Sequence, residues 1–176
     1  MGGFIALELA LRYPDVVSAL VLVDTSGGEF ERVPGFAELR ARLDELARSE
    51  GMEAAFEYNA THNPMAREQF ERHPELREIA RQKMLQTSVD GYIFIWRAIA
   101  QWQPVTHRLS EIKVPTLILV GEEDTMFHRP SQVMNESIPS SRLVMIPGVG
   151  HSPQEEAAEA FNDVVVNFLD GLHLSG

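Results

Sequence analysis

Two side chains, Asp124 and His151, have the types and the order that general acid–base chemistry needs. Asp124 follows an apolar run, residues 114–120, in a Gly-Glu-Glu-Asp turn, and His151 follows another, residues 142–146, in a Pro-Gly-Val-Gly-His turn. A histidine can act as a general base when a carboxylate fixes its tautomer and stabilises the imidazolium. Glycines before the histidine allow a tight turn that presents the ring. We therefore expect an acid–base pair.

Three short, nearly continuous apolar runs must form the elements that carry these side chains. They span residues 18–23, 114–120 and 142–146, and each ends at a turn. Such runs are typical of strands that are buried on both faces of a parallel sheet. Helical patterns are predicted for residues 3–13, 130–136 and 153–172. This alternation indicates an α/β fold, in which functional groups gather at the carboxyl ends of the parallel strands.

A long insertion separates the first and second predicted strands. It is predominantly helical, with predicted helical stretches at residues 36–49, 52–58, 65–84 and 90–101. Breaks are predicted at Pro34, Gly51, Pro64, Pro74 and Pro104. A region of this length and regularity is too structured for a loop. We expect a helical cap at residues 27–110 and a core formed by residues 1–26 and 111–176.

Composition excludes several classes of function. The 176 residues include 15 basic and 26 acidic side chains, and the net charge of −11 argues against nucleic-acid or anionic-membrane partners. No apolar run approaches the roughly 18 residues of a membrane span. The chain has no cysteine, which excludes disulfides, thiolate metal sites and a cysteine nucleophile within it.

No metal or other cofactor is expected, and a small molecule is the expected partner. Apart from His151, no two histidines have the i, i+4 spacing on a helix, with an acid nearby, that a metal site needs. We expect these five histidines at the surface or at an interface: His62, His73, His107, His128 and His173. The start of the chain contains no signal peptide, so we expect a cytoplasmic protein.

The first residues carry a further signal. The chain begins Met1-Gly2-Gly3 and continues into an Ala/Leu-rich helix. In α/β-hydrolases the nucleophile lies in a G-x-S-x-G turn between a strand and a helix. Met-Gly, a second glycine and such a helix often follow that serine. With the turns that contain Asp124 and His151, the chain resembles the C-terminal part of a capped α/β-hydrolase of the esterase, lactonase or C–C hydrolase type.

This resemblance implies roles for three residues. Asp124 would be the acid of a Ser-His-Asp triad, His151 the general base, and the backbone N–H of Met1 one half of the oxyanion hole. The serine would lie directly upstream of Met1, and the substrate would be a small ester, lactone or related carbonyl compound. A chain without the nucleophile is expected to be inactive by itself.

Three alternatives remain open. One is an aspartate nucleophile, as in dehalogenases and epoxide hydrolases. Another is a hydrolase-fold ligand-binding or receptor protein without efficient catalysis. The third is a short protein that forms a homo-oligomer or binds a partner through the exposed edge of the strand at residues 18–23.

Several other side chains have weaker signals. Asp24 ends the first predicted strand, where its Asp-Thr-Ser-Gly-Gly setting suits a turn into the cap and makes it a second choice for the acid. Four apolar side chains could line a substrate pocket, although packing is the better explanation for any one of them: Trp96, Trp102, Met126 and Phe127.

Overall fold

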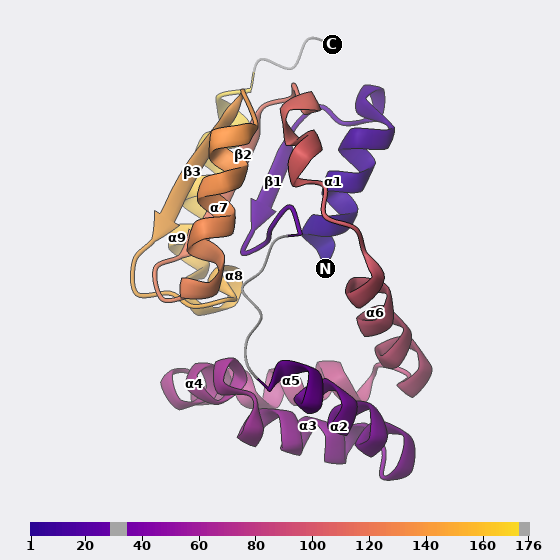
Figure 1. Ribbon diagram of the computed structural model, residues 1–176. Helices are drawn as coiled ribbons and strands as arrows, with labels where there is room; N and C mark the ends of the chain where they lie inside the picture. Colours follow the sequence, from indigo (N-terminus) through magenta and orange to yellow (C-terminus); the bar gives the residue numbers. More distant parts are fainter. Residues whose placement is uncertain (29–34, 173–176) are drawn as a thin grey trace. The chain divides into compact units, whose positions relative to one another are not determined.

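The computed structural model describes residues 1–28 and 35–172 of the chain (Figure 1). The chain divides into two compact units: Met1–Glu31 together with Gln103–Gly176, and Arg32–Trp102. We refer to the first as the sheet unit and to the second as the helical unit. The sheet unit includes the 3-10 helix η2 (Thr106–Glu111), all but the last residue of which lies inside the expected range of the cap. That the helical unit acts as a cap stays a prediction.

The sheet unit is built on three parallel strands in the order β1-β2-β3. These are β1 (Leu20–Val23), β2 (Thr116–Gly121) and β3 (Ser141–Ile146). All six residues of β2 are buried, because this strand has a neighbour on each side and helices on both faces. The predicted α/β fold with parallel strands is confirmed.

Helices cover both faces of this sheet (Figure 1). On one face, α9 (Ala158–Asp170) packs its apolar side against Leu117 and Leu119 of β2. Neighbouring strand residues point to opposite faces, so Ile118 faces the side of α1 (Gly2–Arg12) and α7 (Thr125–Ser137). The predicted apolar stripe of α1 is buried, and the short η1 (Pro14–Val16) follows it.

Two helix boundaries differ from expectation. The helix predicted at residues 130–136 begins at Thr125, with Pro130 inside it. Proline removes one helical hydrogen bond, but Phe127 and Met134 are buried and hold the helix against the sheet unit on both sides of it. The helix predicted at 153–172 is two helices, α8 (Pro153–Glu156) and α9, because the backbone leaves helical geometry at Ala157.

The helical unit contains five α-helices in its described residues. They are α2 (Phe36–Ser49), α3 (Met52–His62), α4 (Pro64–Arg72), α5 (Pro74–Leu85) and α6 (Val89–Gln101). The predicted helix 65–84 is interrupted at His73, since Pro74 disfavours helical geometry in the preceding residue. The helix predicted at 52–58 continues to His62.

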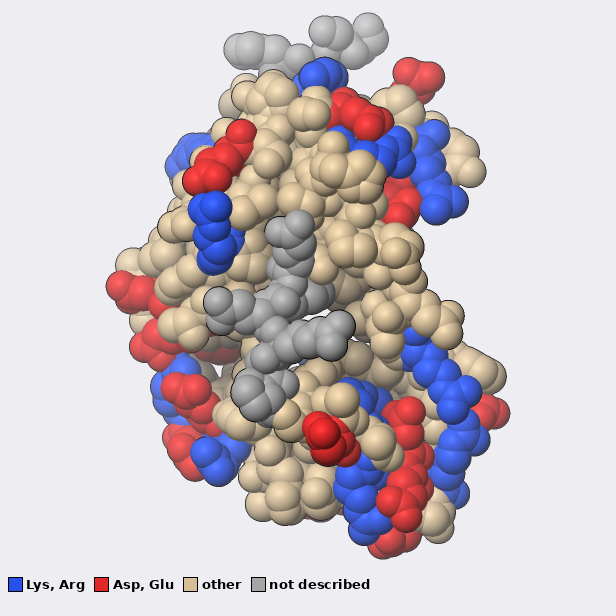
Figure 2. All heavy atoms as spheres, viewed as in Figure 1, with Lys and Arg blue, Asp and Glu red and all other residues tan. Residues whose placement is uncertain are grey.

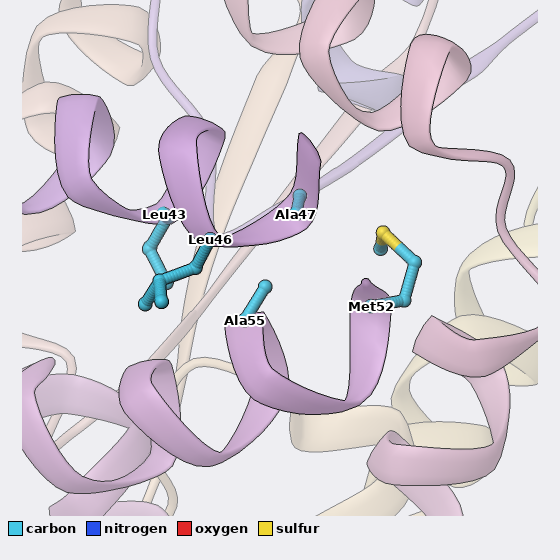
Figure 3. Packing of buried hydrophobic residues seen from close by; sticks show 5 residues of the cluster. All are labelled: Leu43, Leu46, Ala47, Met52 and Ala55. Carbon is cyan, nitrogen blue, oxygen red and sulfur yellow. The ribbon is translucent and has the colours of Figure 1, made fainter. Parts of the chain in front are cut away.

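A small apolar cluster holds the first two of these helices together. Leu43, Leu46 and Ala47 of α2 meet Met52 and Ala55 of α3 (Figure 3). All five are buried. This cluster gives the helical unit an apolar core of its own.

Charged side chains of both signs are interspersed on the visible face of the molecule (Figure 2). Across two helices, Arg81 donates hydrogen bonds to both carboxylate oxygens of Glu53, at 2.7 and 2.6 Å. Such exposed pairs contribute little to stability. Of the helices in the described ranges, none is long and apolar enough to cross a membrane.

Candidate active site

The structure brings Asp124 and His151 into direct contact. Asp124 is the N-cap residue of α7, just beyond the carboxyl end of β2, and His151 lies in the turn after β3. The Nδ1 atom of His151 lies 2.7 Å from Oδ2 of Asp124. Asp124 is 4% exposed, whereas the His151 side chain is 47% exposed. A carboxylate at Nδ1 leaves Nε2 as the ring nitrogen that can accept a proton from a reacting group.

Two glutamates fix the turn that carries His151. Glu156 accepts hydrogen bonds from the amides of Gly150 and Ser152, at 2.7 and 3.0 Å. Glu122 accepts one from the amide of Gly148 at 2.8 Å. Gly148 has a φ of +66°, which favours glycine. Sequence reasoning missed both glutamates, and the available signal was an acid in the first turn of α8.

Backbone contact sets the separation between the turn after β2, which carries Asp124, and the turn after β3, which carries His151. A Cβ atom on Gly121 would lie 2.2 Å from the carbonyl oxygen of Gly150 and 2.3 Å from that of Val149. The amide of Glu123 also donates to the carbonyl of Val149, at 2.9 Å. Glycine at 121 therefore allows the approach that places Asp124 beside His151.

Phe127 lies against the histidine. Its ring centroid is 5.0 Å from that of His151, and its side chain is buried. Met126, its neighbour on α7, is half-buried. Of the four predicted pocket residues, these two belong to the sheet unit.

The two tryptophans belong to the helical unit. The guanidinium group of Arg40 lies 4.4 Å from the centroid of the Trp96 ring, and the ring of Phe36 meets Trp96 edge-on at 6.1 Å. Arg40 also donates to the Tyr92 hydroxyl at 2.7 Å. Trp102 is the C-cap residue of α6. A pocket role for either tryptophan stays a prediction.

Opposing effects determine the pKa of His151. Burial lowers it, but the hydrogen bond and charge of Asp124, together with the charge of Asp24, outweigh burial and raise the pKa above 6.5. The positive charge of the Met1 amine acts in the other direction. This effect shows that the start of α1 lies close to the histidine, and burial in turn lowers the pKa of the Met1 amine.

Asp24 joins the same cluster, although its sequence setting suggested a turn into the cap. It is 7% exposed, and its Oδ1 accepts a hydrogen bond from the amide of Gly121 at 3.0 Å. Three atoms that could bind a metal ion lie within 4.8 Å of one another: a carboxylate oxygen of Asp24, a carboxylate oxygen of Asp124 and a ring nitrogen of His151. Such a set could hold a cation, but the 2.7 Å contact between Asp124 and His151 is a hydrogen-bond distance that a proton bridges.

Comparisons with known proteins identify the family to which the chain belongs. Residues 1–158 match the family described as alpha/beta hydrolase fold. A 2-hydroxy-6-oxononadienedioate/2-hydroxy-6-oxononatrienedioate hydrolase from Burkholderia vietnamiensis is 32% identical, over 96% of this chain and 59% of its own length.

Solved structures are similar as well. MenH from S. aureus has a TM-score of 0.80 and 29% identity, with 96% of this chain and 64% of that chain covered. The enol-lactonase from Burkholderia xenovorans LB400 has a TM-score of 0.78 and 26% identity, with 97% and 63% covered. The chain spans 59% of the length of the Burkholderia vietnamiensis hydrolase and 64% of that of a 30% identical relative from Bacillus subtilis. Relative to these proteins, it corresponds to the C-terminal part. This chain belongs to the α/β-hydrolase fold family.

Proposed function

We propose that this chain supplies the acid and the base of a hydrolase that acts on a small ester, lactone or related carbonyl compound. The 2.7 Å hydrogen bond between Asp124 and His151 carries the proposal. It leaves Nε2 of a half-exposed ring available, and the raised pKa favours proton uptake by the ring. The similar hydrolase and enol-lactonase support the substrate class.

The nucleophile belongs at the position directly before Met1. The charge of the Met1 amine acts on His151, so a residue joined to that nitrogen would begin beside the base. The same nitrogen is at the N-terminus of α1, where backbone N–H groups and the helix dipole favour negative charge. In a continuous chain the Met1 amine becomes an amide N–H, which suits one half of an oxyanion hole.

The reaction then follows from these positions. A serine hydroxyl attacks the substrate carbonyl while Nε2 of His151 takes its proton, and Asp124 stabilises the imidazolium that forms. The Met1 amide and a second donor bind the oxyanion. His151 returns the proton to the leaving group, and water, activated in the same way, releases the acyl product and restores the serine.

The open edge of β1 is the surface where the polypeptide that carries the nucleophile would pack. Among the described strands, β1 pairs only with β2. The amides of Leu20 and Asp24 donate hydrogen bonds to carbonyl groups on the β2 side of the strand. The amides of Val21 and Val23 therefore face the opposite, open edge, where a further strand could accept hydrogen bonds from them.

The adjoining helices add an apolar stripe to this edge. This apolar stripe consists of four side chains that are between 43% and 69% exposed: Ile5, Leu9, Tyr13 and Val16. The spacing of the first three places them on one face of α1. The curated relatives are longer than this chain, which supports a further polypeptide segment as the occupant of the stripe and the strand edge.

The experiment compares two proteins in hydrolysis of p-nitrophenyl acetate. The first is the 176-residue chain, and the second is a chimera in which the N-terminal part of the Burkholderia vietnamiensis relative precedes Met1. We expect no turnover above background from the first. We expect turnover from the chimera that is lost when the serine before Met1 is replaced by alanine.

Two results would overturn this proposal. One is robust turnover by the 176-residue chain that His151→Ala abolishes. The other is a folded chimera that is stabilised by ester analogues without forming product, which would favour a ligand-binding protein of the same fold.

A further inference from the structure

The proposed reaction does not use Asp24, yet the fold holds this side chain firmly at the site. Its φ of +40° makes it the one non-glycine in the described residues with a left-handed backbone. Such a conformation is unfavourable for a residue with a Cβ atom, so the surrounding structure must hold it in place. Its Oδ1 is bound to the amide of Gly121, and its Oδ2 is buried and receives no hydrogen bond from the described residues.

The carboxyl group of Asp124 lies in the same cluster as Asp24 and is a candidate hydrogen-bond partner for the buried Oδ2 atom of Asp24. Carboxylate oxygens only accept hydrogen bonds, so two ionised carboxylates cannot bond to each other. Both carboxyl groups are buried, and the two lie in one cluster. Two like charges in such a place disfavour double ionisation, so one group retains its proton.

Asp24 is the group that keeps the proton. Asp124 is bound to Nδ1 of His151, which favours its ionised form. Burial, helped by the charge of Asp124 and a hydrogen bond shared with it, raises the pKa of Asp24 to about 7 against the opposing effects of the Gly121 amide and the charge of His151.

We propose that Asp24 is a positioning residue whose neutral carboxyl donates its Oδ2 proton to Asp124 and so keeps Asp124 turned toward His151. This role rests on the proposed function of the pair. Asp24 does not touch the reacting atoms and acts only through Asp124. When it ionises, it adds a second negative charge beside His151 and favours the protonated ring.

Four other titratable groups lie near the cluster: the Met1 amine, Glu122, Glu156 and His128. The Met1 amine acts on His151 through its charge. Glu122 and Glu156 accept from the amides of the His151 turn. His128 lies with Nε2 at 3.1 Å from the carbonyl of Gly121. Asp124 and His151 remain as the groups whose charge acts on Asp24.

The test is a pH titration by carbon-13 NMR of the full 176-residue chain, following Cγ of Asp24 and Cε1 of His151. We expect Asp24 to titrate near 7 rather than near 4, and the His151 signal to show a second inflection at the same pH. In Asp24→Asn the amide replaces the donor, so the second inflection disappears while the pKa of His151 stays above 6.5. Asp15→Asn, at an exposed aspartate, serves as the control.

Two results would overturn the inference. Titration of Asp24 near 4 in the unmodified chain would show an ordinary ionised carboxylate, and this measurement requires no variant to fold. A fall of the His151 pKa in Asp24→Asn as large as that in Asp124→Asn would show that Asp24 acts through its charge. Neither measurement requires a nucleophile or turnover, so failure of the proposed function would be seen separately, in the hydrolysis assay.

Discussion

At the scale of single residues, the hydrogen bond between Asp124 and His151 determines what the site can do. It fixes the tautomer of the ring and directs the second nitrogen away from the carboxylate. In the proposed reaction the buried Asp124 and the half-exposed His151 divide the work, because only His151 must reach a substrate. Phe127 packs beside the ring and limits how far it can rotate.

Replacement of the acid is expected to lower the pKa of His151. Asn at position 124 removes the carboxylate charge that raises this pKa and leaves only a neutral oxygen to accept a hydrogen bond from the ring. We expect the pKa of His151 to fall, as measured by NMR titration of the ring. His62 of the same sample is the internal control. An unchanged His151 pKa in a folded Asp124→Asn variant would contradict this account.

Replacement of Asp24 is expected to change how stability depends on pH. The pKa of Asp24 is raised from 3.8 to about 7 in the folded chain, so between these values the folded chain binds more protons than the unfolded one. Stability from this group is therefore present at low pH and is lost as the pH rises toward 7.

Asn tolerates left-handed backbone geometry and avoids this loss. We expect Asp24→Asn to be more stable than the parent at about pH 8, by at least about 1.4 kcal/mol, and to lose that advantage as the pH falls toward about 4. Urea unfolding at both pH values measures the difference. A difference that does not change with pH would argue against a proton on Asp24.

At the scale of elements, close backbone approaches position the site. Gly3 of α1 packs against Thr25, which follows β1, and an added Cβ would lie 2.2 Å from the Thr25 hydroxyl oxygen. Thr25 is buried and β-branched, so it has little freedom to move. This contact fixes the first turn of α1, and with it the Met1 nitrogen, near the end of β1.

Two adjacent glycines of α1 offer a matched comparison. Gly3→Ala is expected to destabilise the chain by about 1–3 kcal/mol, because the methyl group overlaps Thr25. Gly2→Ala meets no atom within 4 Å and should be neutral or slightly stabilising. Urea unfolding of both variants checks this. Equal stability of the two would show that α1 does not pack at Gly3 as described.

Strongly patterned elements could be predicted from the sequence. The central strand β2 is continuously apolar because both of its faces are covered, and the bounds of α2 agree with those predicted. The predicted break at Pro74 is confirmed. The predicted start of α7 was wrong, because a proline limits only local geometry and buried side chains decide whether a helix continues.

The candidate site was only partly predictable for a related reason. Asp124 and His151 each follow an apolar run that marks the end of a strand, so their meeting could be inferred. Asp24 joins them through a positive φ and a bond to Gly121, a long-range partner that no local pattern specifies. The glutamate bonds to the His151 turn likewise depend on tertiary contacts.

At the scale of the whole molecule, the described surface is consistent with an acid–base pair that needs a further segment. The open edge of β1, the apolar stripe of α1 and the nearness of the Met1 nitrogen to His151 all lie in the sheet unit. The relatives are longer than this chain. Under the proposed function, Asp124 and His151 would form a working site together with the proposed nucleophile segment.

The most direct test of this account is the pH dependence of kcat/KM for p-nitrophenyl acetate, measured with the chimera between about pH 5 and about pH 9. We predict a rate that falls on the acidic side with an inflection above 6.5, at the pKa that NMR of the same chimera reports for His151. His151→Ala should remove the activity, and Asp124→Asn should lower it and move the inflection to lower pH. A chimera whose activity survives His151→Ala, or whose profile is flat, would contradict the account.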